Sequence, residues 1–121
     1  MTTKNELKLS QRKPRMHMLR VDESAITGAT ASQDPGLLEA STINEVRLTR
    51  NGDGDYSIAM ATAFARAPIV MVTANVPDAI CYAESITTTG FDVKITTNDG
   101  GSAKAADFHC VIIGFDAADL V

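Results

Sequence analysis

Tryptophan is absent from this chain of 121 residues, aromatic residues make up only 5% of it, and cysteine occurs only twice. Without large aromatic side chains, the core has to be built mainly from Ile, Val, Ala and Met. Two cysteines are too few for the disulfide framework of a small secreted domain. Cys81 and Cys110 each lie inside an apolar run, where a free thiol behaves as a small apolar side chain. We therefore expect both to be buried thiols.

Long hydrophobic segments are also missing. No apolar run approaches the roughly 20 residues of a membrane-spanning helix. Residues 1–21 carry charge but no apolar stretch of the kind found in a signal peptide. We expect a soluble protein that is synthesised in the cytoplasm and has no membrane partner.

Motifs for catalysis, cofactors and metals are lacking as well. The sequence has no phosphate loop, dinucleotide fingerprint, zinc-ligand spacing or serine elbow. Asn51, Asp53 and Asp55 match the start of a calcium loop. However, Tyr56 and Thr62 occupy the sixth and twelfth positions, where such a loop needs glycine and glutamate. A hairpin turn explains the same residues, so we expect no metal and no cofactor.

Nucleophilic catalysis would need a base beside one of the thiols. His109 precedes Cys110 on an expected strand, and adjacent strand residues point to opposite faces, so these two cannot form a pair. Cys81 with His109 across two strands stays conceivable as a thiol–base pair, but a packed or interfacial histidine is the favoured interpretation. The chain is therefore not expected to be an enzyme.

Charge divides the chain into two parts. Residues 1–20 hold six basic side chains and one acidic one, a net +5, whereas residues 21–121 hold five basic and fourteen acidic ones, a net −9. A basic segment on an acidic body indicates a partner that is acidic where the segment lies. Nucleic acid is one alternative, because basic side chains release counterions from phosphates. Residues 4–20 contain no aromatic side chain for base stacking, so nucleic acid is the less favoured partner.

The hydrophobic pattern predicts an all-β protein, an antiparallel β-sandwich with an extended N-terminal arm. Residues 1–40 are expected to form the basic arm and a turn-rich linker, and residues 41–121 the sandwich domain. Alternating apolar residues flank the turn at residues 51–54, which is a strong hairpin signal. Residues 108–115 are nearly all apolar, as in a central strand that is buried on both faces. The expected core includes Phe91, Val93, Ile95, Phe108, Cys110 and Ile112.

Three segments carry a resemblance to a known family. They are VRLTRNGDGDYSIAMATAFARAPIVMVT (residues 46–73), SITTTGFDVKI (residues 85–95) and FHCVIIGFD (residues 108–116). Together they resemble the carboxy-terminal domains of bacteriophage tail fibres and related H-type-lectin-like virion modules. The resemblance implies an antiparallel sandwich, usually trimeric, on the outer surface of a virion.

Two departures from that family shape the functional expectation. Cys110 or Val111 stands where many of those domains have an aromatic residue, which puts an inherited glycan site in doubt. We also expect a short arm and no long fibre shaft before the sandwich. The expected lack of a shaft favours a capsid decoration (cement) protein over the alternative, a short tail-fibre or receptor-binding (lectin-like) module.

The expected mechanism is adhesion through the arm to the major capsid protein or other virion subunits, as a homotrimer. Extended arms can pair with exposed strand edges of a neighbouring subunit, and a trimer would also cover the sandwich's own edges. The predicted arm contacts are of two kinds. The apolar anchors are Leu7, Leu9, Met16, Met18, Leu19 and Val21, and the charged contacts are Arg12, Lys13, Arg15 and Arg20.

Overall fold

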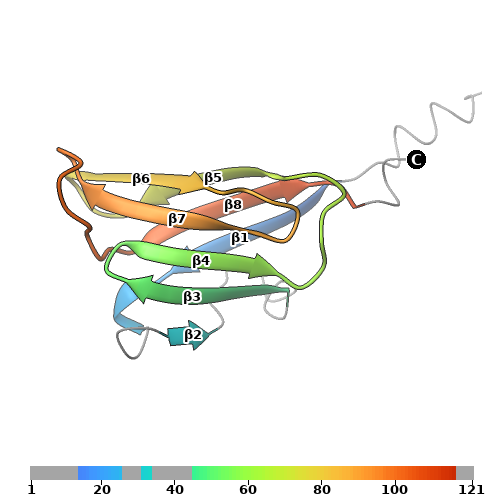
Figure 1. Ribbon diagram of the computed structural model, residues 1–121, viewed down its shortest axis with the longest axis horizontal. Helices are drawn as coiled ribbons and strands as arrows, with labels where there is room; N and C mark the ends of the chain where they lie inside the picture. Colours follow the sequence, from blue (N-terminus) through green and yellow to red (C-terminus); the bar gives the residue numbers. More distant parts are fainter. Residues whose placement is uncertain (1–13, 26–30, 34–44, 117–121) are drawn as a thin grey trace, which may run out of the picture.

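Two antiparallel sheets pack face to face in a computed structural model, which describes residues 14–25, 31–33 and 45–116 (Figure 1). The three-stranded sheet has the order β1 (Arg15–Val21), β8 (Phe108–Gly114), β5 (Ile69–Ala74). The five-stranded sheet has the order β2 (Ala31–Gln33), β3 (Val46–Gly52), β4 (Asp55–Met60), β7 (Gly90–Thr97), β6 (Ala79–Glu84). One short 3-10 turn, η1 (Glu23–Ala25), follows β1. The predicted all-β sandwich is confirmed.

The β3–β4 hairpin forms where the sequence predicts it. Gly54 adopts φ +62°, a left-handed conformation that glycine adopts without strain. A Cβ at this position would collide with the carbonyl oxygen of Ile95, and the Gly54 carbonyl accepts a hydrogen bond from the Ile95 N–H at 2.9 Å. Glycine is therefore required here by conformation and by the close approach of β7.

The core lies between the sheets and is built from inward-facing alternate residues. All six predicted core residues are buried, which confirms that part of the sequence interpretation. Tyr56 and Phe108, from opposite sheets, place their ring centroids 5.0 Å apart at the centre. The remaining buried apolar residues are Leu19, Val21, Val46, Leu48, Ile58, Met60, Phe64 and Ala106.

The predicted boundary between an arm at residues 1–40 and a domain at residues 41–121 is wrong. β1 pairs with β8 along its whole length, from Arg15 opposite Gly114 to Val21 opposite Phe108. The physical reason is a period of two that the basic composition conceals: His17, Leu19 and Val21 point inward, whereas the intervening residues point outward. The sandwich therefore includes residues 15–21.

β8 is the central strand of its sheet, as predicted, but it is buried on one face only. Its inward residues are fully covered, whereas His109 is exposed and Val111 and Ile113 are half-buried. On the neighbouring strands, Met16, Ile69 and Met71 are about half exposed or more, so the outer face of this sheet is largely open to solvent. An apolar strand with one uncovered face indicates a surface that binds another molecule.

Candidate functional site

The outer face of the three-stranded sheet is mostly apolar. Strand register aligns nine outward residues in three rows: Met16, Ile113 and Ile69; Met18, Val111 and Met71; Arg20, His109 and Thr73. We call these nine residues the apolar face. Ile69 is 67% exposed, Met71 53% and Met16 45%. Large apolar side chains exposed together in this way mark interaction surfaces more often than single exposed ones do.

The opposite outer face of the sandwich, on the five-stranded sheet, has a different character. Ser57 donates a hydrogen bond to Asp92 at 3.0 Å, and Lys94 forms an ion pair with Asp55 at 2.6 Å. Such a polar surface is the ordinary water-facing side of an antiparallel sheet. The outer surface of β4 and β7 is therefore polar, unlike the apolar face.

At its Met16 end the apolar face continues into an open pocket of about 350 Å³. The pocket is lined by Arg66, Ala67, Pro68, Ile69, Ile113, Gly114 and Phe115. Ile69 and Ile113 belong to both surfaces. The pocket is large enough to receive one aromatic or aliphatic side chain from a partner.

The charge on this surface is of one sign. Arg20 lies at one end of the apolar face and the exposed Arg66 at the pocket end. None of the nine face residues or the seven pocket residues is Asp or Glu. The surface therefore suits a partner that places carboxylates beside apolar side chains.

A second exposed apolar region lies on β6, at the edge of the five-stranded sheet. Ile80 and Tyr82 point outward and are 42% and 44% exposed, and Ile86 follows at 37%. The exposed Glu84 lies directly opposite Asp92 on β7, and like charges in that position repel each other. We call Ile80, Tyr82, Glu84 and Ile86 the β6 strip.

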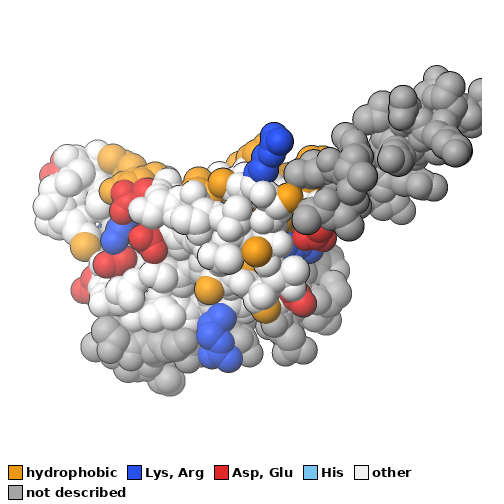
Figure 2. Space-filling model, turned by 45° about the vertical axis from the view of Figure 1, so that its right-hand side comes forward, with side chains coloured by type: hydrophobic (Ala, Val, Ile, Leu, Met, Phe, Trp, Pro, Cys, Tyr) orange, Lys and Arg blue, Asp and Glu red, His pale blue; other side chains and the backbone are white. Residues whose placement is uncertain are grey.

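β5 and β6 are edge strands that lie side by side at the upper border of the sandwich (Figure 1). Within the part of the chain that the structure describes, each pairs with one neighbour only. β5 has no charge and no proline, and β6 carries only Glu84. Charged residues and prolines usually protect natural edge strands from pairing with another chain. Figure 2 shows apolar side chains along this same border.

Arg15 closes one end of the sandwich. Its guanidinium lies 4.0 Å from the centroid of the Phe64 ring. Its Nε donates to Asp116 at 2.9 Å, and its Nη2 donates to the Thr62 carbonyl at 2.8 Å. These contacts hold the start of β1 against the end of β8. The Arg15 guanidinium is therefore bonded to groups of the same protein molecule.

His17 lies beside Arg15 and is only 2% exposed. Its Nε2 lies 3.2 Å from Nη1 of Arg15, and Nδ1 has no hydrogen-bond partner among the described residues. Burial and, second, the positive charge of Arg15 lower the pKa of His17, while Glu45 and Asp116 oppose this shift. The imidazole is therefore held neutral inside the fold.

Folding stability should fall as the pH is lowered through about 6.5, the ordinary pKa of histidine, because of His17. An unfolded histidine takes up a proton near pH 6.5, whereas the folded protein resists protonation at this site, so acid favours the unfolded state. In the variant His17→Leu this part of the pH dependence should disappear, as measured by urea unfolding at several pH values. His109→Leu, on the exposed face, is the control and should retain the dependence. An unchanged slope in His17→Leu would contradict the assignment.

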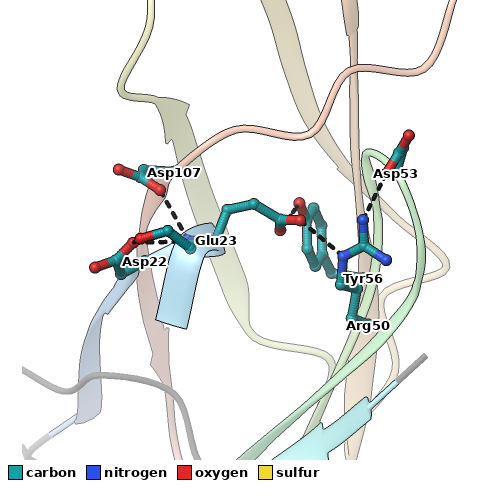
Figure 3. Close-up of polar contacts among 7 residues, drawn as sticks. Asp22, Glu23, Arg50, Asp53, Tyr56 and Asp107 are labelled. Atoms are coloured by element: carbon teal, nitrogen blue, oxygen red, sulfur yellow. Dashed lines mark hydrogen bonds and ion pairs between the residues drawn. The ribbon is translucent and has the colours of Figure 1, made fainter. Parts of the chain in front are cut away.

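A polar cluster joins η1 to the β3–β4 hairpin (Figure 3). Arg50 donates to Glu23 at 2.7 Å and to Asp53 at 2.5 Å, and the Tyr56 hydroxyl donates to the other oxygen of Glu23. The Glu23 N–H donates to Asp107 at 2.8 Å. Burial and the contact with Glu23 raise the pKa of Tyr56. Tyr56 is fully buried, and these contacts fix η1 against the β3–β4 turn.

The thiols are poorly suited to nucleophilic chemistry. Both cysteines are free. Burial raises the pKa of Cys81 to about 11 and that of Cys110 to about 12, the latter with a smaller contribution from Cys81. Thiolates, which are the reactive form, are therefore scarce near neutral pH. Cys81 packs against the core while His109 points away from it on the other sheet, so the conceivable Cys81–His109 pair does not form.

The segment that resembles the start of a calcium loop is a hairpin turn. Asp53 is bound to Arg50 and Asp55 to Lys94, and Asn51 donates to Ser57. Among residues 14–25, 31–33 and 45–116, no group of three His, Cys, Asp or Glu side chains is arranged to hold a metal ion.

The predicted arm contacts separate into four groups. Leu7, Leu9, Arg12 and Lys13 lie outside the described residues. Leu19 and Val21 were predicted as partner contacts, and this is wrong, because both are core residues with 0% and 1% exposure. Arg15 is engaged within the chain, whereas Met16, Met18 and Arg20 lie on the apolar face.

Sequence reasoning did not identify Ile69, Met71 and Ile113 as surface residues. A signal was available, because β5 and β8 are apolar at both odd and even positions. That pattern has two explanations, a strand covered on both sides or a strand with an interaction face, and periodicity alone does not separate them.

In the described part of the chain, no helix is long and apolar enough to cross a membrane. No protein-family model, curated protein or solved structure matches this chain.

Proposed function

We propose that this chain is a non-enzymatic structural protein of a bacteriophage virion, a capsid decoration protein that acts by association with other proteins. The observation that carries this proposal is the apolar face, a strand-built surface with three large side chains about half exposed or more. Among the described residues, His109 points away from the core against which Cys81 packs and in which Cys110 is buried, so it is paired with neither thiol. The viral setting rests on the resemblance of residues 46–73, 85–95 and 108–116 to phage virion modules.

Attachment to the particle is assigned to the segment before the sandwich. Residues 1–13 hold four basic side chains and one acidic one, a net +3, together with Leu7 and Leu9. Exposed ion pairs contribute only about 0–1 kcal/mol each, so the leucines would supply much of the contact and Arg12 and Lys13 its salt dependence. The major capsid protein or another virion subunit is the proposed partner.

A reconstitution experiment tests this function. Particles stripped of the protein are mixed with the full-length chain, with a chain lacking residues 1–13, or with the variant Ala59→Glu. Ala59 lies exposed on the polar outer sheet, so this variant is the control. We expect the full-length and control proteins to sediment with the particles and the truncated protein to remain free.

The alternatives give other outcomes. If the protein bound to phage tails and not to heads, this would favour the second candidate, a short tail-fibre or receptor-binding module. Sedimentation of the truncated protein at the full-length level would contradict the anchoring role of residues 1–13. Absence of the protein from purified particles and failure of every form to bind stripped ones would contradict the virion role. Tight binding to naked nucleic acid that weakens steeply with salt would do the same.

A further inference from the structure

We propose that β5 accepts an extended segment of another protein as a further strand of the three-stranded sheet, with apolar side chains of the segment on the apolar face and an acidic side chain beside Arg66. This inference rests on the proposed function as an association module and names the chemistry of the partner. Strand addition of this kind draws its affinity from main-chain hydrogen bonds and its selectivity from alternate side chains.

The hydrogen-bonding groups of β5 divide between its two edges. The Asn75 N–H donates to the Asp107 carbonyl at 2.8 Å, directly after the pairing of Ala74 with Phe108. Hydrogen-bonded and non-hydrogen-bonded positions alternate in an antiparallel pair, so every second residue back from Asn75 bonds to β8. The N–H and C=O groups of the residues between them point to the free edge, and these residues are Val70, Val72 and Ala74.

This edge is open to pairing. Within the described part of the chain β5 pairs with β8 alone, and it carries no charge and no proline of its own. Pro68, the preceding position in the same alternation, has no N–H, so the row of donors begins at Val70. The edge therefore offers a short ladder that matches about five residues of a partner.

The side chains beside this edge select apolar residues. Residues of an added strand that lie opposite Ile69, Met71 and Thr73 form non-hydrogen-bonded pairs, in which the facing side chains are closest. These positions of β5 point outward, and Ile69 and Met71 are 67% and 53% exposed. Apolar side chains opposite them would gain cross-strand contacts and cover both. We therefore expect apolar residues at alternate positions of the segment.

Arg66 selects the charge at one end of the segment. It is exposed, lines the same pocket as Ile69, and forms no ion pair with any residue that the structure describes. The other residues of the pocket carry no charge. All strand pairs of the sandwich are antiparallel, so a segment that continues this pattern ends beside Arg66. An Asp or Glu after the last apolar residue would pair with its guanidinium.

The other edge strand at this border suits such a segment less well. β5 and β6 lie side by side there (Figure 1), and apolar side chains follow the border (Figure 2). The β6 strip contains Glu84, which faces Asp92, and no base, so it would repel a further carboxylate. A second copy of β5 is not favoured either, because β5 has no acidic residue to place beside Arg66.

The test uses the isotope-labelled full-length chain and the synthetic peptide acetyl-Ser-Thr-Thr-Val-Thr-Leu-Ser-Glu-amide. Placed antiparallel to β5, its Val and Leu lie opposite Met71 and Ile69, and its Glu follows on the same side as Leu, toward Arg66. Nuclear magnetic resonance follows the backbone amides. We expect a dissociation constant of about 1 mM or lower, with the largest shifts on β5. In the free chain the amides of Val70 and Val72 should exchange with solvent faster than their neighbours, and the peptide should slow them.

Matched variants separate the main-chain contribution from the charge. The same peptide N-methylated at its third and fifth residues, which would face Val72 and Val70, should bind about tenfold more weakly. Arg66→Glu should weaken binding of the original peptide about threefold to tenfold and should favour a peptide with Lys in place of Glu. The control Ala59→Glu, on the polar outer sheet, should bind both peptides as the wild type does.

Three results would overturn the inference. They are slow exchange of the Val70 and Val72 amides in the free chain, which would mean that another part of the chain or a second copy already covers this edge, no binding of the peptide up to about 5 mM, and equal binding of the N-methylated peptide. If these occurred while the chain still sedimented with stripped particles, the proposed function would stand without strand addition. Peptide binding on β5 by a chain that never binds particles would support the inference and reject the virion role.

Discussion

Deleting residues 1–21 should abolish folding, whereas deleting residues 1–13 should leave the sandwich folded. The first deletion removes β1, and with it Leu19 and Val21, which are fully buried in the core. Burial of two such side chains contributes about 3–6 kcal/mol, and the loss of all β1–β8 pairing adds to this. Since a domain of this size has about 5–15 kcal/mol of stability in total, little or none would remain.

Circular dichroism and thermal unfolding distinguish the two truncations. The protein lacking residues 1–13 should keep a cooperative transition near that of the full chain, because the pairing of β1 begins only at Arg15. The protein lacking residues 1–21 should show no cooperative transition. If it unfolds cooperatively at nearly the full-length midpoint, β1 contributes little to the core and the assignment of residues 15–21 to the sandwich is wrong.

Replacing Phe108 with alanine should cost about 3–5 kcal/mol of folding free energy, as is usual for deletion of a buried ring. Phe108 is fully buried on the central strand of its sheet, and its ring packs against Tyr56 of the facing sheet. The substitution would leave a cavity between the two sheets. Neither sheet can move in to fill it without breaking strand pairing.

The adjacent residue supplies the control. His109 occupies the same strand but points outward and is exposed, so His109→Ala should change stability by no more than about 0.5 kcal/mol. Urea unfolding curves give both values. A cost well below 1 kcal/mol for Phe108→Ala would place this strand at the periphery of the core.

The sequence was most informative where structure is local. The hairpin at Gly54 and the inward positions Phe91, Val93 and Ile95 follow from turn chemistry and a period of two, both of which involve residues close together along the chain. The final strand was recognised by its apolar run. These features account for the correct sandwich assignment.

The sequence was misleading where pairing is distant. Arg15 pairs with Gly114, 99 positions away (114 − 15), and no pattern within residues 15–21 reveals that partner. The basic residues in and before β1 are typical of an extended arm. This composition conceals the weaker alternation of His17, Leu19 and Val21. The contact of Glu23 with Tyr56 and Arg50 was likewise invisible, because it joins segments that only the packing of the two sheets brings together.

The sequence by itself thus determined the class of fold, the hairpin and the inward faces of β7 and β8, because alternation and turn residues act over a few positions. Only the tertiary structure decided that β1 completes a three-stranded sheet and that this sheet leaves an apolar face open. It also decided that β5 and β6 share one border. Periodicity tells which residues share a face of a strand, but what covers that face depends on elements far away in the chain.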